Sequence, residues 1–151
     1  MVIRPATHHD ISQLTALAGR FFVASSFAKF IDCSESGLSA AIERVIDAGI
    51  IFVVVSQEII IGGLAGIMAP AWFAPQNKVA TEVGWWVDQD QRGGIAAIRL
   101  LHRVEQWAAE NGANSIAMSD MVMSDGSTPA GSLFTRMGYA LAERSHIKRI
   151  A

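Results

Sequence analysis

A carboxylate on an apolar strand and a glycine-containing turn just after it are the residues of this chain best suited to chemistry. Glu82 lies within residues 79–87, where alternation predicts a strand and places Glu82 on the same face as Gly84. An apolar setting raises the pKa of a carboxylic acid toward neutrality, where it can act as a general base. The alternatives are an exposed carboxylate or an ion-pair partner of Arg92 or Lys148.

The turn that follows is typical of an anion-binding site. The sequence Gln91-Arg-Gly-Gly-Ile-Ala-Ala97 leads directly into an amphipathic helix. N–H groups in the first turn of a helix have no intrahelical acceptor, and small residues let a phosphate approach them closely. A tight turn that merely starts a helix is the alternative interpretation.

Two common phosphate-binding loops do not fit this turn. A P-loop requires a Lys followed by Ser or Thr after its second glycine, and the turn has neither. A dinucleotide-binding fingerprint requires GxGxxG at the start of a parallel βαβ unit, and both the glycine spacing and the preceding strand order differ. The pattern that remains is Gln/Arg-x-x-Gly-x-Gly/Ala.

Hydrophobic periodicity predicts the elements that position these residues. The order is one strand, two helices, three mostly antiparallel strands, a helix, a strand, a helix and two final strands. This order indicates an α/β (α+β) fold with a mixed, mostly antiparallel sheet of about seven strands and four helices. We expect strands at residues 2–4, 50–56, 59–68, 79–87, 114–119, 139–141 and 145–150, and helices at 11–22, 38–46, 94–111 and 130–137.

Composition limits the function classes. With 151 residues, 51% of them hydrophobic, the chain can form a single domain over residues 1–151. The lone Cys33 and the absence of zinc-ligand spacing predict no disulfide and no metal site, as is usual in a reducing cytoplasm. A net charge of −2 argues against a nucleic-acid partner, and no apolar run is long enough to span a membrane.

Taken together, the turn at residues 91–96 and the element order resemble the GNAT family of N-acetyltransferases. Two further segments strengthen the resemblance: Glu82-Val-Gly-Trp-Trp-Val87, and Leu133-Phe-Thr-Arg-Met-Gly-Tyr139, which is similar to the family's Leu-Tyr-Glu-Lys-Leu-Gly-Phe. The resemblance runs from Val2 to Ile150 and is strongest to small prokaryotic or phage-type members. It implies the acyl-CoA N-acyltransferase-like fold.

The resemblance also implies a reaction and roles for residues. The reaction is transfer of the acetyl group of acetyl-CoA to a primary amine by direct attack in a ternary complex. Glu82 would be the general base, and the backbone of Val87 would pair with the pantetheine arm. The pyrophosphate would be held, mainly by backbone N–H groups, at Gln91, Arg92, Gly93, Gly94, Ile95, Ala96 and Ala97. The acceptor would be a small-molecule or peptidyl amine, and no metal is needed.

The sequence departs from the family at the general acid. Phe134 stands where relatives usually have the tyrosine that protonates the departing thiolate. Water, Ser119 or Ser124 would then supply the proton, because a thiolate with a pKa near about 8.5 demands little of its acid. We expect Tyr139 to pack in the core. The alternative function is a non-catalytic acyl-CoA-binding or regulatory protein, and a third is an acyltransferase for longer chains or hydroxyl acceptors.

The remaining expectations concern surfaces. His146 and Lys148 share one face of the final strand, where relatives often form homodimers or line the acceptor groove. A homodimer is therefore expected. Four aromatic side chains could line the acceptor site or could pack in the core or in an interface. They are Trp72, Phe73, Trp85 and Trp86.

Overall fold

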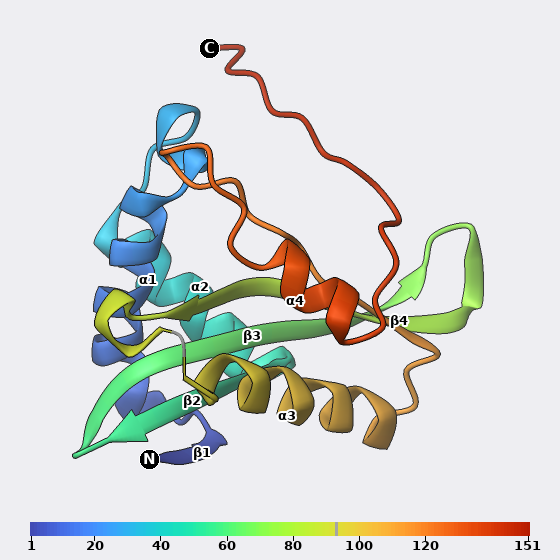
Figure 1. The fold of residues 1–151 in the computed structure, drawn as a ribbon, viewed down its shortest axis with the longest axis horizontal. Coiled ribbons are helices and arrows are strands. Elements are labelled where there is room, and N and C mark those ends of the chain that lie inside the picture. The colour runs from blue at the N-terminus through green and yellow to red at the C-terminus, as the bar shows by residue number, and fades with distance from the viewer. Residues whose placement is uncertain (93) are drawn as a thin grey trace.

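The computed structural model describes residues 1–92 and 94–151. These residues form one mixed sheet with its strands in sequence order (Figure 1). Neighbours are antiparallel from β1 to β4, and β5 runs parallel to β4. The strands are β1 (Val2–Pro5), β2 (Ile50–Ser56), β3 (Ile59–Ala71), β4 (Ala74–Val87) and β5 (Ser115–Ala117).

Helices cover both faces of this sheet. Helices α1 and α2 pack on one face and α3 packs on the other (Figure 1). The α2 helix starts at a side-chain cap, because Oγ of Ser34 accepts a hydrogen bond from the N–H of Gly37 at 3.1 Å. The described residues contain α1 (Ile11–Ala24), α2 (Glu35–Ala48), α3 (Ala96–Glu110) and α4 (Gly131–Arg136), with 3₁₀ turns at His8–Asp10, Ser26–Lys29 and Gln89–Gln91.

Two apolar cores hold the layers together. Leu64 of β3 and Leu100 of α3 belong to the core under α3, while Leu17 of α1 and Val53 of β2 belong to the core under α1 and α2. Because β2 and β3 are buried on both faces, their sequences are continuous apolar runs without alternation. The mixed α/β class and the four helices expected from the sequence are confirmed.

The expectation of about seven strands is wrong, because the described residues form five. Residues 139–141 and 145–150, which were predicted as strands, pair with no strand and are almost all exposed. The chain turns at Gly138, which has a positive φ of 86°, and then runs away from the sheet (Figure 1). A strand exists only where a partner satisfies its backbone groups, and an alternating pattern does not provide that partner.

A β-bulge at Val83 reverses which side chains of β4 face which layer. Gly66 pairs with Glu82 and Ala65 pairs with Gly84, so Val83 has no partner on β3. The prediction that Glu82 shares a face with Gly84 is therefore wrong. Glu82 lies on the α3 side of the sheet, the same side as Trp85.

Strand β4 and the edge strand β5 part immediately beyond their short pairing. Val79–Thr81 pair with residues 115–117, and β4 then continues to Val87 without a partner on that edge. The N–H of Asp88 donates to the carbonyl of Ile61 at 2.9 Å, toward β3. Since successive residues point to opposite sides of a strand, the N–H and C=O of Val87 point into the opening.

Removing a side chain from the core under α3 tests this packing. Leu100 is fully buried, so Leu100→Ala should lower the free energy of unfolding by about 2–5 kcal/mol, measured by urea denaturation. The control is Val23→Ala on α1, whose side chain is 72% exposed, with an expected change within about 0.5 kcal/mol. Equal effects of the two changes would contradict the assignment of the core.

Candidate active site

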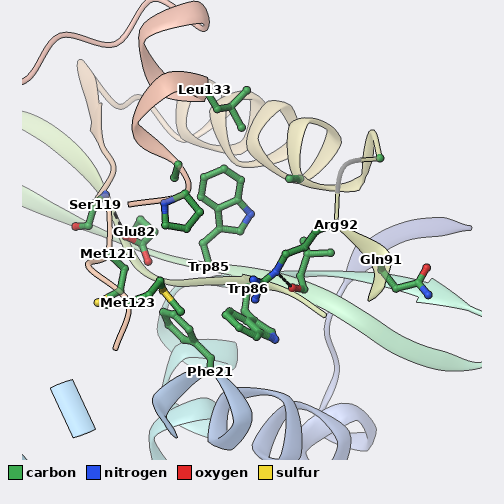
Figure 2. Close-up of a pocket in the computed structure, with 15 residues that line it drawn as sticks. Phe21, Glu82, Trp85, Trp86, Gln91, Arg92, Ser119, Met121, Met123 and Leu133 are labelled. Carbon is green, nitrogen blue, oxygen red and sulfur yellow. Dashed lines mark hydrogen bonds between the residues drawn. The ribbon is translucent and has the colours of Figure 1, made fainter. Parts of the chain in front are cut away.

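A cleft with a volume of about 260 Å³ opens where β4 and β5 part. The first turn of α3, helix α4, the end of α1 and the segment after β5 surround it (Figure 2). The described residues that line it are Phe21, Glu82, Trp85, Trp86, Val87, Gln91, Arg92, Gly94, Ala97, Ser119, Met121, Met123, Pro129, Ala130 and Leu133.

Glu82 is the acidic residue of this cleft. Its side chain is mostly buried, and its Oε2 accepts a hydrogen bond from the backbone N–H of Ser119 at 3.2 Å (Figure 2). Burial raises the pKa of Glu82 to about 7, against the opposing effect of the hydrogen bonds from Ser119. Among the described residues, neither Arg92 nor Lys148 forms an ion pair with it. Glu82 can therefore accept a proton near neutral pH.

Arg92 makes its contacts on the opposite side of the cleft from Ser119 (Figure 2). Its Nε donates to the carbonyl of Val87 at 2.8 Å, and its guanidinium lies 3.9 Å from the ring centre of Trp86. The Trp86 indole N–H donates to Asp88 at 3.3 Å, and Asp88 forms an ion pair with Arg20 of α1 at 2.9 Å. These contacts join the end of β4 to α1 and fix the orientation of Trp86.

Among the described residues, the backbone N–H groups in the first turn of α3 have no acceptor. The first hydrogen bond of the helix runs from the N–H of Arg99 to the carbonyl of Ile95 at 2.9 Å, so the preceding amide groups have no acceptor within the helix. Space above Gly94 is open, since a Cβ there would meet only the carbonyl oxygen of Gln91, at 3.9 Å. An anion can approach this turn closely.

A second donor in the cleft wall lacks a partner. Nε1 of Trp85 is buried, and no acceptor in the described part of the chain reaches it. Buried donors in proteins are nearly always satisfied, because an unsatisfied one costs about 1–3 kcal/mol. The indole N–H is thus an unsatisfied donor in the wall of the cleft.

The structure groups most of the residues predicted to bind the coenzyme. Val87, Gln91, Arg92, Gly94 and Ala97 line the cleft. By contrast, the side chain of Ile95 is exposed and that of Ala96 is buried in the core, so these two can contribute backbone groups only. Gly93 lies outside the described residues.

No aromatic hydroxyl of α4 or its C-terminal end faces the cleft. In the described structure Phe134 is buried outside the cleft lining, between Trp85 and Tyr139 at ring distances of 5.6 and 5.4 Å. The hydroxyl of Tyr139 donates to Glu105 at 2.8 Å, and burial together with Glu105 raises the pKa of this phenol. Ser119 is the hydroxyl-bearing residue that lines the cleft.

Sequence reasoning missed part of the wall on the α1 side. Phe21, Met121 and Met123 meet there because backbone hydrogen bonds join the end of α1 to the segment after β5, from the N–H of Ser26 to Val122 at 3.0 Å and from the N–H of Ser124 to the carbonyl of Ala24 at 2.9 Å. The sequence feature that could have indicated this part of the wall is the apolar run Met121-Val-Met123 in the loop after the predicted strand.

Of the four aromatic candidates for the acceptor site, two lie in the cleft. Trp85 and Trp86 line it. Trp72 and Phe73 do not, because they occupy the turn between β3 and β4 and are 88% and 76% exposed. The described residues contain no group of three or more His, Cys, Asp or Glu side chains that could hold a metal ion, and no helix among them is long and apolar enough to cross a membrane.

Comparison with known proteins shows which family the sequence matches. The model of the Acetyltransferase (GNAT) family matches residues 17–139. None of the curated proteins compared with the chain matches it.

Solved structures share the fold. A Trypanosoma brucei acetyltransferase is 17% identical, with a TM-score of 0.74 and 99% of each chain covered. AAC(6')-Iy, in complex with a bisubstrate analogue of CoA and acetylneamine, is 16% identical with a TM-score of 0.78, covering 99% of this chain and 97% of the other. An acetyltransferase from Clostridium acetobutylicum, solved with acetyl-CoA, is 15% identical with a TM-score of 0.74, covering 98% and 95%.

The burial of Glu82 has a direct spectroscopic test. The ¹³C chemical shift of its carboxyl carbon should titrate with a midpoint near pH 7, and the amide proton of Ser119 should titrate with it. In Glu82→Gln the titration of the Ser119 amide should disappear. A midpoint below about 5, close to the ordinary value for glutamate, would show that the side chain is solvated.

Proposed function

The chain belongs to the GNAT acetyltransferase family, and we propose that it transfers the acetyl group of acetyl-CoA to a primary amine, with Glu82 as the general base. The observation that carries the proposal is a mostly buried carboxylate, with its pKa raised to about 7, in the same cleft as an open helix N-terminus. Structures less than 20% identical share only the fold with this chain, so their acceptors are not transferred to it.

The residues present fit acetyl-CoA. Gly94 leaves room for a phosphate against the free amides of α3, and Trp85 offers a buried donor without an acceptor. The outward N–H of Val87 can pair with an amide of an extended arm, as an added strand would. When bound, acetyl-CoA supplies an acetyl group already activated as a thioester.

The protein's own residues then hold the amine and move its proton. Glu82, directly or through a water molecule, takes a proton from the ammonium group, because only the neutral amine has a lone pair for attack. The nitrogen forms a bond to the acetyl carbon and loses its second proton to solvent, the carbon–sulfur bond breaks, and the thiolate is protonated to free coenzyme A. Ser119 or solvent supplies this last proton, since Phe134 and Tyr139 present no hydroxyl to the cleft.

A second function is favoured by the same missing acid. General acid catalysis is worth roughly 10²- to 10⁴-fold, so its loss fits either a slow enzyme or a protein that binds acyl-CoA without turnover. Calorimetry with acetyl-CoA and a thiol-release assay with a broad panel of amines separate the two. Binding without thiol release would establish the binding protein.

Other expectations stay predictions. The single domain, the homodimer, the cytoplasmic location and acceptance of a peptidyl amine are among them, as is the possibility of longer acyl chains or hydroxyl acceptors. The molar mass in solution by light scattering tests the dimer.

Glu82→Gln tests the base. It should lower kcat by about 10²- to 10⁴-fold while the Kd for acetyl-CoA changes little, because the side chain acts on the amine. In the unmodified protein kcat/KM should rise tenfold per pH unit below about 7 and level off above it, since the base works only when deprotonated. The matched control is Glu43→Gln, an exposed site on α2. An unchanged rate and pH profile in Glu82→Gln would remove this residue from the mechanism.

Gly94→Val tests the phosphate site. The added side chain enters open space, so the thermal unfolding of the variant should be unchanged, but it blocks approach to the amides of α3. Loss of one or two charge-assisted hydrogen bonds weakens acetyl-CoA binding by about 10- to 100-fold, measurable by calorimetry. Gly19→Val on α1, also in open space, is the control. Full affinity in Gly94→Val would place the coenzyme elsewhere.

A further inference from the structure

The end of the cleft away from α3 is apolar and polarisable. Phe21 and Trp86 are in contact there, with ring centres 5.2 Å apart, and Met121 and Met123 lie beside them (Figure 2). Met123 is buried, whereas Phe21, Trp86 and Met121 keep part of their surface exposed to the cleft. A wall of two aromatic rings and two thioethers favours an apolar ligand body, with sulfur–aromatic contacts adding to burial.

Charge in the same cleft is sparse. Among the described lining residues the acid is Glu82, and the cation is Arg92. Three carboxylates on neighbouring segments lie outside the lining. Asp88 forms an ion pair with Arg20, whereas the exposed side chains of Asp120 and Asp125 keep their charge and accept hydrogen bonds from the N–H groups of Ala130 and Ser127. The cleft therefore offers one counter-charge to one ammonium group.

A second ammonium group would have no partner in this cleft. Burying an unpaired charge is strongly unfavourable, and the guanidinium of Arg92 repels a further cation. An apolar body, in contrast, gains about 25 cal/mol for each Å² removed from water against Phe21, Met121 and Met123. Both effects favour an acceptor with one ammonium group and an apolar body.

We propose that the acceptor is a primary monoamine with an apolar, aromatic body, such as an arylalkylamine, and that polycationic amines are excluded. This inference rests on the proposed acetyl transfer and specifies its substrate class. The amine nitrogen meets Glu82, while the aromatic body lies against Phe21, Trp86, Met121 and Met123.

Three amines distinguish the effect of an apolar body from the effect of the number of charges. Phenethylamine carries one ammonium group and an aromatic ring, ethanolamine carries one ammonium group without an apolar body, and neamine carries several ammonium groups. With saturating acetyl-CoA and thiol release as the readout, kcat/KM for phenethylamine should exceed that for ethanolamine by about 10- to 100-fold, the range expected for burying one aromatic side chain. Neamine should be the poorest of the three.

Two variants test whether the apolar wall of the cleft causes the preference for phenethylamine. Phe21→Ala should lower the phenethylamine-to-ethanolamine ratio by about tenfold, and Met121→Gln, which keeps the volume but adds polar atoms, should lower it as well. Phe22→Ala, the adjacent phenylalanine of α1 outside the described cleft lining, should leave the ratio unchanged. Thermal unfolding of each variant confirms that it is folded.

A binding measurement keeps the two proposals separate. The Kd of each amine for the complex of the unmodified protein with coenzyme A, which carries no acetyl group to transfer, should follow the order of kcat/KM when measured by calorimetry. Faster acetylation or tighter binding of neamine than of phenethylamine would overturn the inference and leave the acetyl transfer standing. Tighter binding of phenethylamine, with no thiol released from any amine by the unmodified protein, would support the apolar site and overturn the enzyme.

Discussion

The early end of the pairing between β4 and β5 is the constraint on which the rest of the site depends. Three residue pairs hold the strands together. Beyond them β5 ends at Ala117, while β4 continues to Val87 paired with β3 on its other edge only. Backbone groups that a sheet would normally satisfy are thereby left facing an opening, next to the unsatisfied amides at the start of α3. A site for an extended ligand with an anionic end follows from incomplete pairing, before any side chain is considered.

Side chains convert that opening into a reactive site through partial burial. The burial that raises the pKa of Glu82 extends to Trp85, whose indole N–H has no acceptor among the described residues. Both are unfavourable in the unliganded protein, and the two cores on either side of the sheet supply the packing that tolerates them. Packing elsewhere thus stabilises a cleft that keeps a carboxylate with a raised pKa and an indole N–H without an acceptor among the described residues.

Much of this arrangement could be predicted from the sequence because it is local. Periodicity identified the helices and the central strands, and small residues after a strand identified the turn at Gln91–Ala97. Glu82 lines the cleft but lies on the face opposite to the predicted one, because one unpaired residue, Val83, shifts the register. The prediction of two final strands was wrong because those residues have no partner strand. The proximity of Phe21 to Met123 could not be predicted, because it depends on tertiary hydrogen bonds between segments about a hundred residues apart.

The hydrogen bond between Arg92 and the carbonyl of Val87 has a consequence for affinity. The side chain of Arg92, five residues away, acts as a tethered competitor for any ligand that would donate a hydrogen bond to this carbonyl, and its effective concentration is high because the connecting chain is short. The affinity observed for such a ligand is therefore its intrinsic affinity multiplied by the fraction of molecules in which the arginine has moved away. The hydrogen bond and the stacking on Trp86 both hold the arginine in place, so an aromatic residue behind the site lowers the affinity for such a ligand.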